Sequence, residues 1–130
     1  MIVDTSAVIA ILRNEPDAAR YARAIEGAGH RRISAVSYLE AAAAIDGSRD
    51  PIVSRLFDEL LREAQIAIEP VTAEQVKIAR EAYRDFGRGS GHPAGLDLGD
   101  CFAYALAKTT GGPLLFKGDN FKHCDVKAAD

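Results

Sequence analysis

The sequence predicts a three-layer α/β fold, in which helices cover both faces of a short parallel sheet. Short apolar runs alternate with longer amphipathic segments along the chain, and this order implies strands joined by helical crossovers. Capping residues precede most of the amphipathic segments, which supports their assignment as helices. The 130 residues are enough for one core, and no internal repeat is visible, so residues 1–130 are expected to form a single domain.

The first 30 residues predict one strand and two helices. Residues 1–3 are apolar and form the first expected strand. Thr5 or Ser6 can then cap a helix that runs to Leu12, because a hydroxyl oxygen accepts from the free N–H groups of a first turn. Pro16 is expected to open the second helix, since its missing N–H costs nothing at a helix start.

The next stretch predicts two further strands around two helices. Residues 32–35 form the second expected strand, and Ser37 is placed to cap the alanine-rich helix behind it. Pro51 starts an amphipathic helix, and residues 66–68 form a third short strand. The apolar side of the helix from Pro51, which is expected to face the core, comprises Ile52, Val53, Leu56, Phe57, Leu60 and Leu61.

The last part of the chain predicts two helices and one or two strands. A helix is expected from Thr72 to Phe86, and the glycine-rich residues 87–95 form a loop. That loop follows a helix and lacks a Gly-Lys-Ser/Thr ending, so it does not predict a nucleotide site. A helix from about Leu98 leads into a strand at 113–116, and a fifth strand is expected near 125–127.

Composition limits the classes of protein. Hydrophobic residues make up 48% and charged residues 27%, which is typical of a globular domain. No apolar run reaches membrane-spanning length, and no basic leader precedes the first strand, so we expect an unexported, cytoplasmic protein. Cys101 is expected in the core, and Cys124 lacks the partners of a zinc site. The net charge of −3 does not favour nucleic-acid binding, although a metal at an acidic site would reverse the local field.

Four acidic residues are expected to meet at one edge of the sheet. Asp4 ends the first strand, Glu40 lies early in the helix after the second, and Asp119 follows the fourth. Asp100 begins the helix that leads into the fourth strand, and a crossover helix returns its amino end to the carboxyl edge of the strands. Without a counter-ion these carboxylates would repel one another. Mg²⁺ or Mn²⁺ is the ordinary remedy, and either would support phosphodiester hydrolysis.

Helix capping is the competing interpretation of the acids at this helix start. Asp97 is placed as the N-cap, and Asp100 then falls at the third helical position, where a carboxylate meets free N–H groups. The two interpretations of Asp100 are compatible. No serine or cysteine has an obvious histidine base, so the sequence offers no other nucleophile.

Four ordered motifs resemble the PIN-domain ribonucleases, and within them the VapC toxins of bacterial toxin–antitoxin pairs. The resemblance covers essentially the whole chain, and its motifs are MIVDTSAVIAIL at the start, Ser37–Glu40, LGDCFAYALA at 98–107, and Pro113–Gly118. The resemblance implies a PIN-like, Rossmann-like domain and a Mg²⁺- or Mn²⁺-dependent endoribonuclease. It also implies a small cognate antitoxin of the VapB kind as partner, and relatives tend to form homodimers. By motif position, Asp4, Glu40 and Asp100 carry over as the metal-binding, catalytic acids.

The chain departs from the family pattern at two places. Asp97 stands where many relatives have Asn, and it is expected to cap the helix or act outside the direct metal ligands. Asn120 stands where relatives commonly have Asp. Three alternatives follow: Asp119 completes the site, the Asn120 amide oxygen completes it, or the fourth ligand is weak. Thr5 and Ser6 match the hydroxyl pair of the first motif, where they either cap the helix or position Asp4.

Two other functions compete with the ribonuclease. A haloacid-dehalogenase-like phosphohydrolase also begins with Asp after the first strand, but it needs a second Asp two residues on, where this chain has Ser6. A catalytically idle PIN domain that binds RNA or protein is the second alternative, and Asn120 is its only support.

Overall fold

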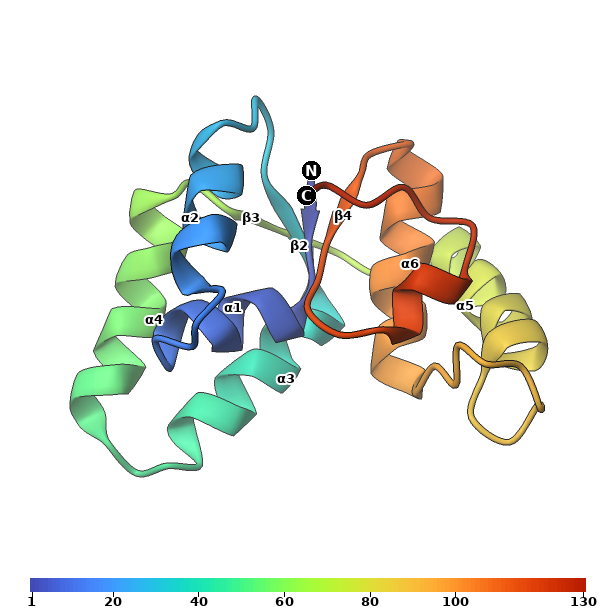
Figure 1. Cartoon of the computed structure of the whole chain (residues 1–130), viewed down its shortest axis with the longest axis horizontal. Coiled ribbons are helices and arrows are strands. Elements are labelled where there is room, and N and C mark those ends of the chain that lie inside the picture. The colour runs from blue at the N-terminus through green and yellow to red at the C-terminus, as the bar shows by residue number, and fades with distance from the viewer.

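A short parallel sheet forms the centre of the computed structural model, which describes residues 1–130 (Figure 1). Its strands lie in the order β3-β2-β1-β4, and every neighbouring pair is parallel. β1 is therefore an inner strand, and the chain leaves it at the same edge where β2 and β4 end. The strands are β1 (Ile2–Val3), β2 (Arg32–Ser34), β3 (Ala67–Glu69) and β4 (Leu114–Leu115).

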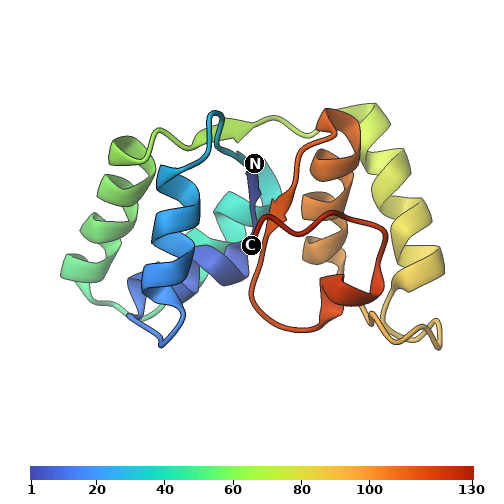
Figure 2. The ribbon, with the colours of Figure 1, turned by 45° about the horizontal axis from the view of Figure 1, so that its top comes forward.

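Helices cover the sheet in two separate layers (Figure 2). The first layer contains α1 (Thr5–Leu12), α2 (Ala18–Glu26), α3 (Ala35–Asp46) and α4 (Pro51–Glu63). The second contains α5 (Ala73–Phe86) and α6 (Leu98–Thr110), with the short 3₁₀ helix η1 (Asn120–His123) beside them. The predicted three-layer α/β fold is thus confirmed.

Each layer has its own hydrophobic core. Tyr21 and Phe57 are buried in the first core, together with Val3 from β1. Leu96 and Leu106 are buried in the second, together with Ile2 from the same strand. Neighbouring residues of β1 therefore point into opposite layers, as strand geometry requires. Burying one such large side chain contributes about 1.5–3 kcal/mol, so β1 is held firmly from both sides.

The helix starts follow capping residues, but two of them differ from the prediction. Asp4, and not Thr5 or Ser6, is the N-cap of α1. Ser34 caps α3, so this helix begins at Ala35 and Ser37 lies inside it, fully buried and with its hydroxyl unpaired. In both cases the capping residue directly follows or ends the strand, so no linker separates strand and helix. Each helix therefore begins earlier than the predicted capping residue implied.

Three other expectations need correction. α2 begins at Ala18, two residues after Pro16, because a turn precedes it. The predicted fifth strand is wrong: the final segment forms only one isolated bridge, between Leu114 and Ala128. On α4 the expected apolar face is only partly buried, since Ile52 and Leu56 stay exposed. None of the helices has both the length and the apolar character that crossing a membrane requires.

Candidate active site

Asp4 lies at the carboxyl end of β1 and is the only charged residue that is buried. Only 4% of its surface is exposed. Its Oδ2 atom accepts two hydrogen bonds from Ser6, at 3.0 Å from the backbone N–H and 2.6 Å from the hydroxyl. The Ser6 hydroxyl also accepts a hydrogen bond from the backbone N–H of Lys117 at 2.9 Å. This bond links the segment that follows β4 to the segment that follows β1. Asp4 is therefore held rigidly by the strand ends.

Glu40 projects from α3 toward the same edge. Thr5 approaches it from α1: its hydroxyl donates to the Ser37 carbonyl at 2.9 Å and lies 3.5 Å from Glu40 Oε1. The Glu40 carboxylate packs on Gly99 at the start of α6, and a Cβ added there would overlap both carboxylate oxygens. Gly99 thus makes room for Glu40 beside α6. Sequence analysis missed this role, although the glycine stands inside the LGDC motif.

Asp97 and Asp100 form a reciprocal capping box at the start of α6. Asp97 Oδ1 accepts the N–H of Asp100 at 2.8 Å, and Asp100 Oδ2 accepts the N–H of Asp97 at 3.1 Å. The capping interpretation is therefore confirmed for both residues. Each carboxylate uses one oxygen for the cap and keeps the other free of hydrogen bonds from side chains, so the cap does not exclude a second role.

The electrostatics of the site couple these four carboxylates. Burial raises the pKa of Asp4, and the negative charge of Asp97 raises it further against the opposing hydrogen bonds from Ser6. Burial also raises the pKa of Asp100 to about 7, with added repulsion from Asp4, Asp97 and Glu40. Glu40 keeps an exposed side chain, yet desolvation of its carboxylate and the charges of Asp97 and Asp4 raise its pKa. Like charges are thus held close together at one edge.

No basic side chain compensates this negative charge. Every Lys–acid or Arg–acid ion pair of the structure involves other residues, and none includes Asp4, Glu40, Asp97 or Asp100. A divalent cation is the counter-ion that suits such a set, because hard oxygen donors select Mg²⁺ or Mn²⁺. The donor set therefore fits this kind of metal.

The acidic side chains do not converge on one point, however. No group of three or more Asp, Glu, His or Cys side chains lies close enough together to hold a metal ion. One oxygen of Asp4 is held by Ser6, and one oxygen of Asp100 is held by the capping N–H of Asp97. Mg²⁺ usually keeps several waters and uses only one or two carboxylates directly, so an incomplete cage still fits it.

Asp119 is not brought into this cluster. Its side chain is 80% exposed and pairs with Lys122 at 3.0 Å, and this hydrogen bond lowers its pKa. Asn120 is also exposed, at the start of η1. The four predicted acids therefore divide into three that are coupled at the sheet edge and one that is paired separately, and Asp97 is the fourth member of the coupled set.

The comparisons with known proteins agree with this geometry. The PIN-domain family model matches residues 1–127. Ribonuclease VapC28 of Mycobacterium tuberculosis is 59% identical over 129 residues, covering 99% of this chain and 97% of its own length. Ribonuclease VapC42 of the same species is 50% identical, covering 99% and 98%.

A solved structure shows the same fold. The crystal structure of Mycobacterium tuberculosis VapC20, described as a sarcin-ricin loop cleaving toxin, superposes with a TM-score of 0.72. It is 13% identical and covers 96% of this chain and 95% of its own, so this likeness supports the fold alone. On the family model and the two close relatives, the chain belongs to the PIN-domain family, in its group of VapC ribonucleases.

Proposed function

We propose that this protein is a Mg²⁺- or Mn²⁺-dependent endoribonuclease and the toxin of a toxin–antitoxin pair. The observation that carries the proposal is the set of coupled carboxylates around Asp4, which no Lys or Arg neutralises. The ribonuclease names of VapC28 and VapC42 support the choice of RNA as substrate. An idle binding domain would have no reason to keep several acids with raised pKa values at one buried edge.

Asp4 and Asp100 would hold the metal, and Glu40 would complete the site directly or through water. The ion would polarise the scissile phosphate and lower the pKa of a bound water. Ser6 fixes the orientation of Asp4 through its two donors, and Thr5 steadies Glu40. Glu40, exposed to solvent and with a raised pKa, is suited to orient the attacking water and accept its proton.

Asp97 and Asp119 would act more indirectly. Asp97 holds the backbone of α6 and adds negative charge next to Asp100, so we assign it to positioning. Asp119 keeps the place in the catalytic set that its motif gives it, but it would act from the substrate side, since it is exposed and paired with Lys122.

The partners follow from the same proposal. RNA is the substrate, and a small VapB-like antitoxin is expected to hold the enzyme inactive. Exposed apolar side chains offer surface for that partner and for a homodimer, and they include Leu39, Ile52 and Leu56 on one layer and Val76, Tyr83 and Leu98 on the other. Both cysteines are free, which agrees with action in the cytoplasm.

Cleavage of single-stranded RNA by the purified protein tests the proposal. The wild type is expected to cleave with Mg²⁺ or Mn²⁺ and not with EDTA. Asp4→Asn and Asp100→Asn should each lower the cleavage rate at least about 100-fold. Even the loss of a residue that only hydrogen-bonds to a metal ligand costs about 10–100-fold, and these variants change the ligands themselves. Asp58→Asn is the matched control, since Asp58 is an exposed acid on α4. Equal rates for all four proteins would contradict the proposal.

A further inference from the structure

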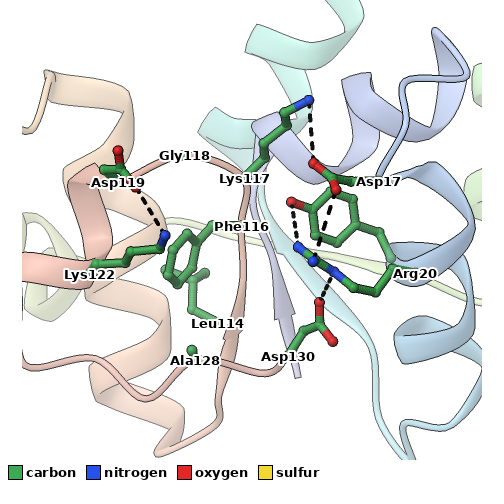
Figure 3. A pocket seen from close by; sticks show the side chains of 11 residues that line it. Asp17, Arg20, Leu114, Phe116, Lys117, Gly118, Asp119, Lys122, Ala128 and Asp130 are labelled. Atoms are coloured by element: carbon green, nitrogen blue, oxygen red, sulfur yellow. Dashed lines mark hydrogen bonds and ion pairs between the residues drawn. The ribbon is translucent and has the colours of Figure 1, made fainter.

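A cavity of about 360 Å³ lies between α2 and η1 (Figure 3). Its volume falls in the range of small-molecule sites, roughly 300–1,000 Å³. The side chain of Phe116 lies between Lys122 on one side and Arg20 with Asp17 on the other. The residues that carry the argument are Asp17, Arg20, Phe116, Lys117, Asp119 and Lys122.

The cavity is connected directly to Asp4. Lys117 lines it, and the backbone N–H of Lys117 donates to the Ser6 hydroxyl at 2.9 Å. That hydroxyl in turn donates to Asp4 Oδ2 at 2.6 Å. One side chain therefore separates the wall of the cavity from the proposed metal ligand, so a strand whose phosphate lies at Asp4 would bring a neighbouring nucleotide to this cavity.

The charges of the cavity balance one another. Arg20 Nε lies 2.5 Å from Asp130, and Lys122 lies 3.0 Å from Asp119. Lys117 lies 3.6 Å from Asp17 and 2.7 Å from Glu15, which is not part of the cavity lining. Three cations and three carboxylates thus line the same space. A phosphate would have to displace carboxylates that repel it. An uncharged ligand with both donors and acceptors on its edge meets a partner for each of them.

One part of the cavity wall is apolar. Phe116 is half-buried there, and the ring of Phe121 packs against it with centroids 5.3 Å apart, which fixes its orientation. Buried Leu114 and the small side chain of Ala128 line the space next to it. An aromatic face inside a rim of donors and acceptors matches the two surfaces of a nucleobase, which stacks through its plane and is read along its edge.

We propose that this cavity binds one nucleobase of single-stranded RNA, next to the phosphate that is cleaved. Phe116 stacks on the base, while Arg20, Lys122 and their paired carboxylates contact its polar edge. The cavity would then set sequence preference at one position of the substrate. The identification of the ligand as RNA rests on the proposed ribonuclease function.

Binding of short RNAs without a divalent metal tests this inference separately from cleavage. Fluorescent hexamers of adenylate, cytidylate, guanylate and uridylate are titrated into the full chain in EDTA. The wild type should bind one of them at least about tenfold more tightly than another, since one hydrogen bond to a charged group contributes on that order. Arg20→Gln and Lys122→Gln should each reduce this ratio below about threefold.

The control is Arg55→Gln, because Arg55 is exposed and ion-paired on α4, away from the cavity residues. It should keep the wild-type ratio. Equal affinity of the wild type for all four hexamers would overturn the inference. So would a weaker affinity of both cavity variants with an unchanged ratio, since that result indicates phosphate contact. If discrimination follows the prediction but the protein never cleaves RNA, only the proposed nuclease function fails.

Discussion

Replacing Asp100 by Asn should stabilise the metal-free protein while abolishing its stabilisation by metal. The variant removes one of the coupled negative charges. It keeps the helix cap, because the amide oxygen of Asn can accept the N–H of Asp97 as the Oδ2 atom of Asp100 does. If Asp100 were only a capping residue, the stability would stay unchanged or fall by up to about 1 kcal/mol.

The magnitude follows from the pKa of Asp100. A rise from 3.8 to about 7 corresponds to ~4 kcal/mol, at about 1.36 kcal/mol for each pKa unit. The carboxylate is only partly buried, so solvent screening reduces the figure to ~2 kcal/mol. The sign depends on pH. Well below pH 3.8 both the folded and the unfolded chain hold this proton. As pH rises from 3.8 to about 7, the unfolded chain releases the proton while the folded chain keeps it, so stability falls across this window and the full cost is present above pH ~7.

Thermal unfolding in EDTA measures this difference. At pH ~8 Asp100→Asn should melt roughly 8 °C above the wild type, at about 4 °C per kcal/mol for a domain of this size. At pH ~4 the two should coincide. At pH ~8, Mg²⁺ at 100 times its Kd for the wild type should raise the free energy of unfolding of the wild type by ~2.7 kcal/mol and leave that of the variant unchanged. A variant less stable than the wild type in EDTA, or equally stabilised by Mg²⁺, would refute the reasoning; Asp58→Asn is the control.

Three further changes have distinct expected outcomes. Gly99→Ala should leave unfolding stability equal or up to ~1 kcal/mol higher, because Ala favours helix, yet it should slow RNA cleavage at least about tenfold by displacing Glu40. Ser6→Ala leaves Asp4 with only the backbone N–H of residue 6 as donor and leaves the N–H of Lys117 without an acceptor, so chemical denaturation should show a loss of about 1–3 kcal/mol. Asp119→Asn should change the Mn²⁺ affinity measured by calorimetry less than about twofold, since it lies outside the coupled acids, whereas a larger loss would return it to the metal ligands.

Local signals in the sequence predicted most of the fold. The alternation of apolar runs and amphipathic segments gave the parallel sheet between helices, and the caps at Thr72 and Asp97 marked their helices correctly. Errors arose where two local signals competed. Ser34 and Ser37 are both good caps, and only the end of β2 decides between them. The sequence near 125–127 predicts a strand, but the final segment pairs with β4 at only a single bridge.

The candidate site was predictable in part for the same reason. Topology brings the end of β1 and the start of α6 to one edge, so the proximity of Asp4 and Asp100 follows from the order of elements. Asp119 follows a strand as well, but the turn at Gly118 and the ion pair with Lys122 carry its side chain to the surface. The fit of Glu40 over Gly99 depends on how closely α3 and α6 pack, which no local pattern reveals.

The gathering of distant acids around one divalent ion is tested most directly by anomalous diffraction from crystals grown with Mn²⁺. We predict one strong manganese peak within about 2.0–2.3 Å of carboxylate oxygens of both Asp4 and Asp100, close to the distances that Mg²⁺ makes. Crystals of Asp100→Asn should lose that peak. Saturated wild-type crystals with no manganese at these side chains would contradict the central claim.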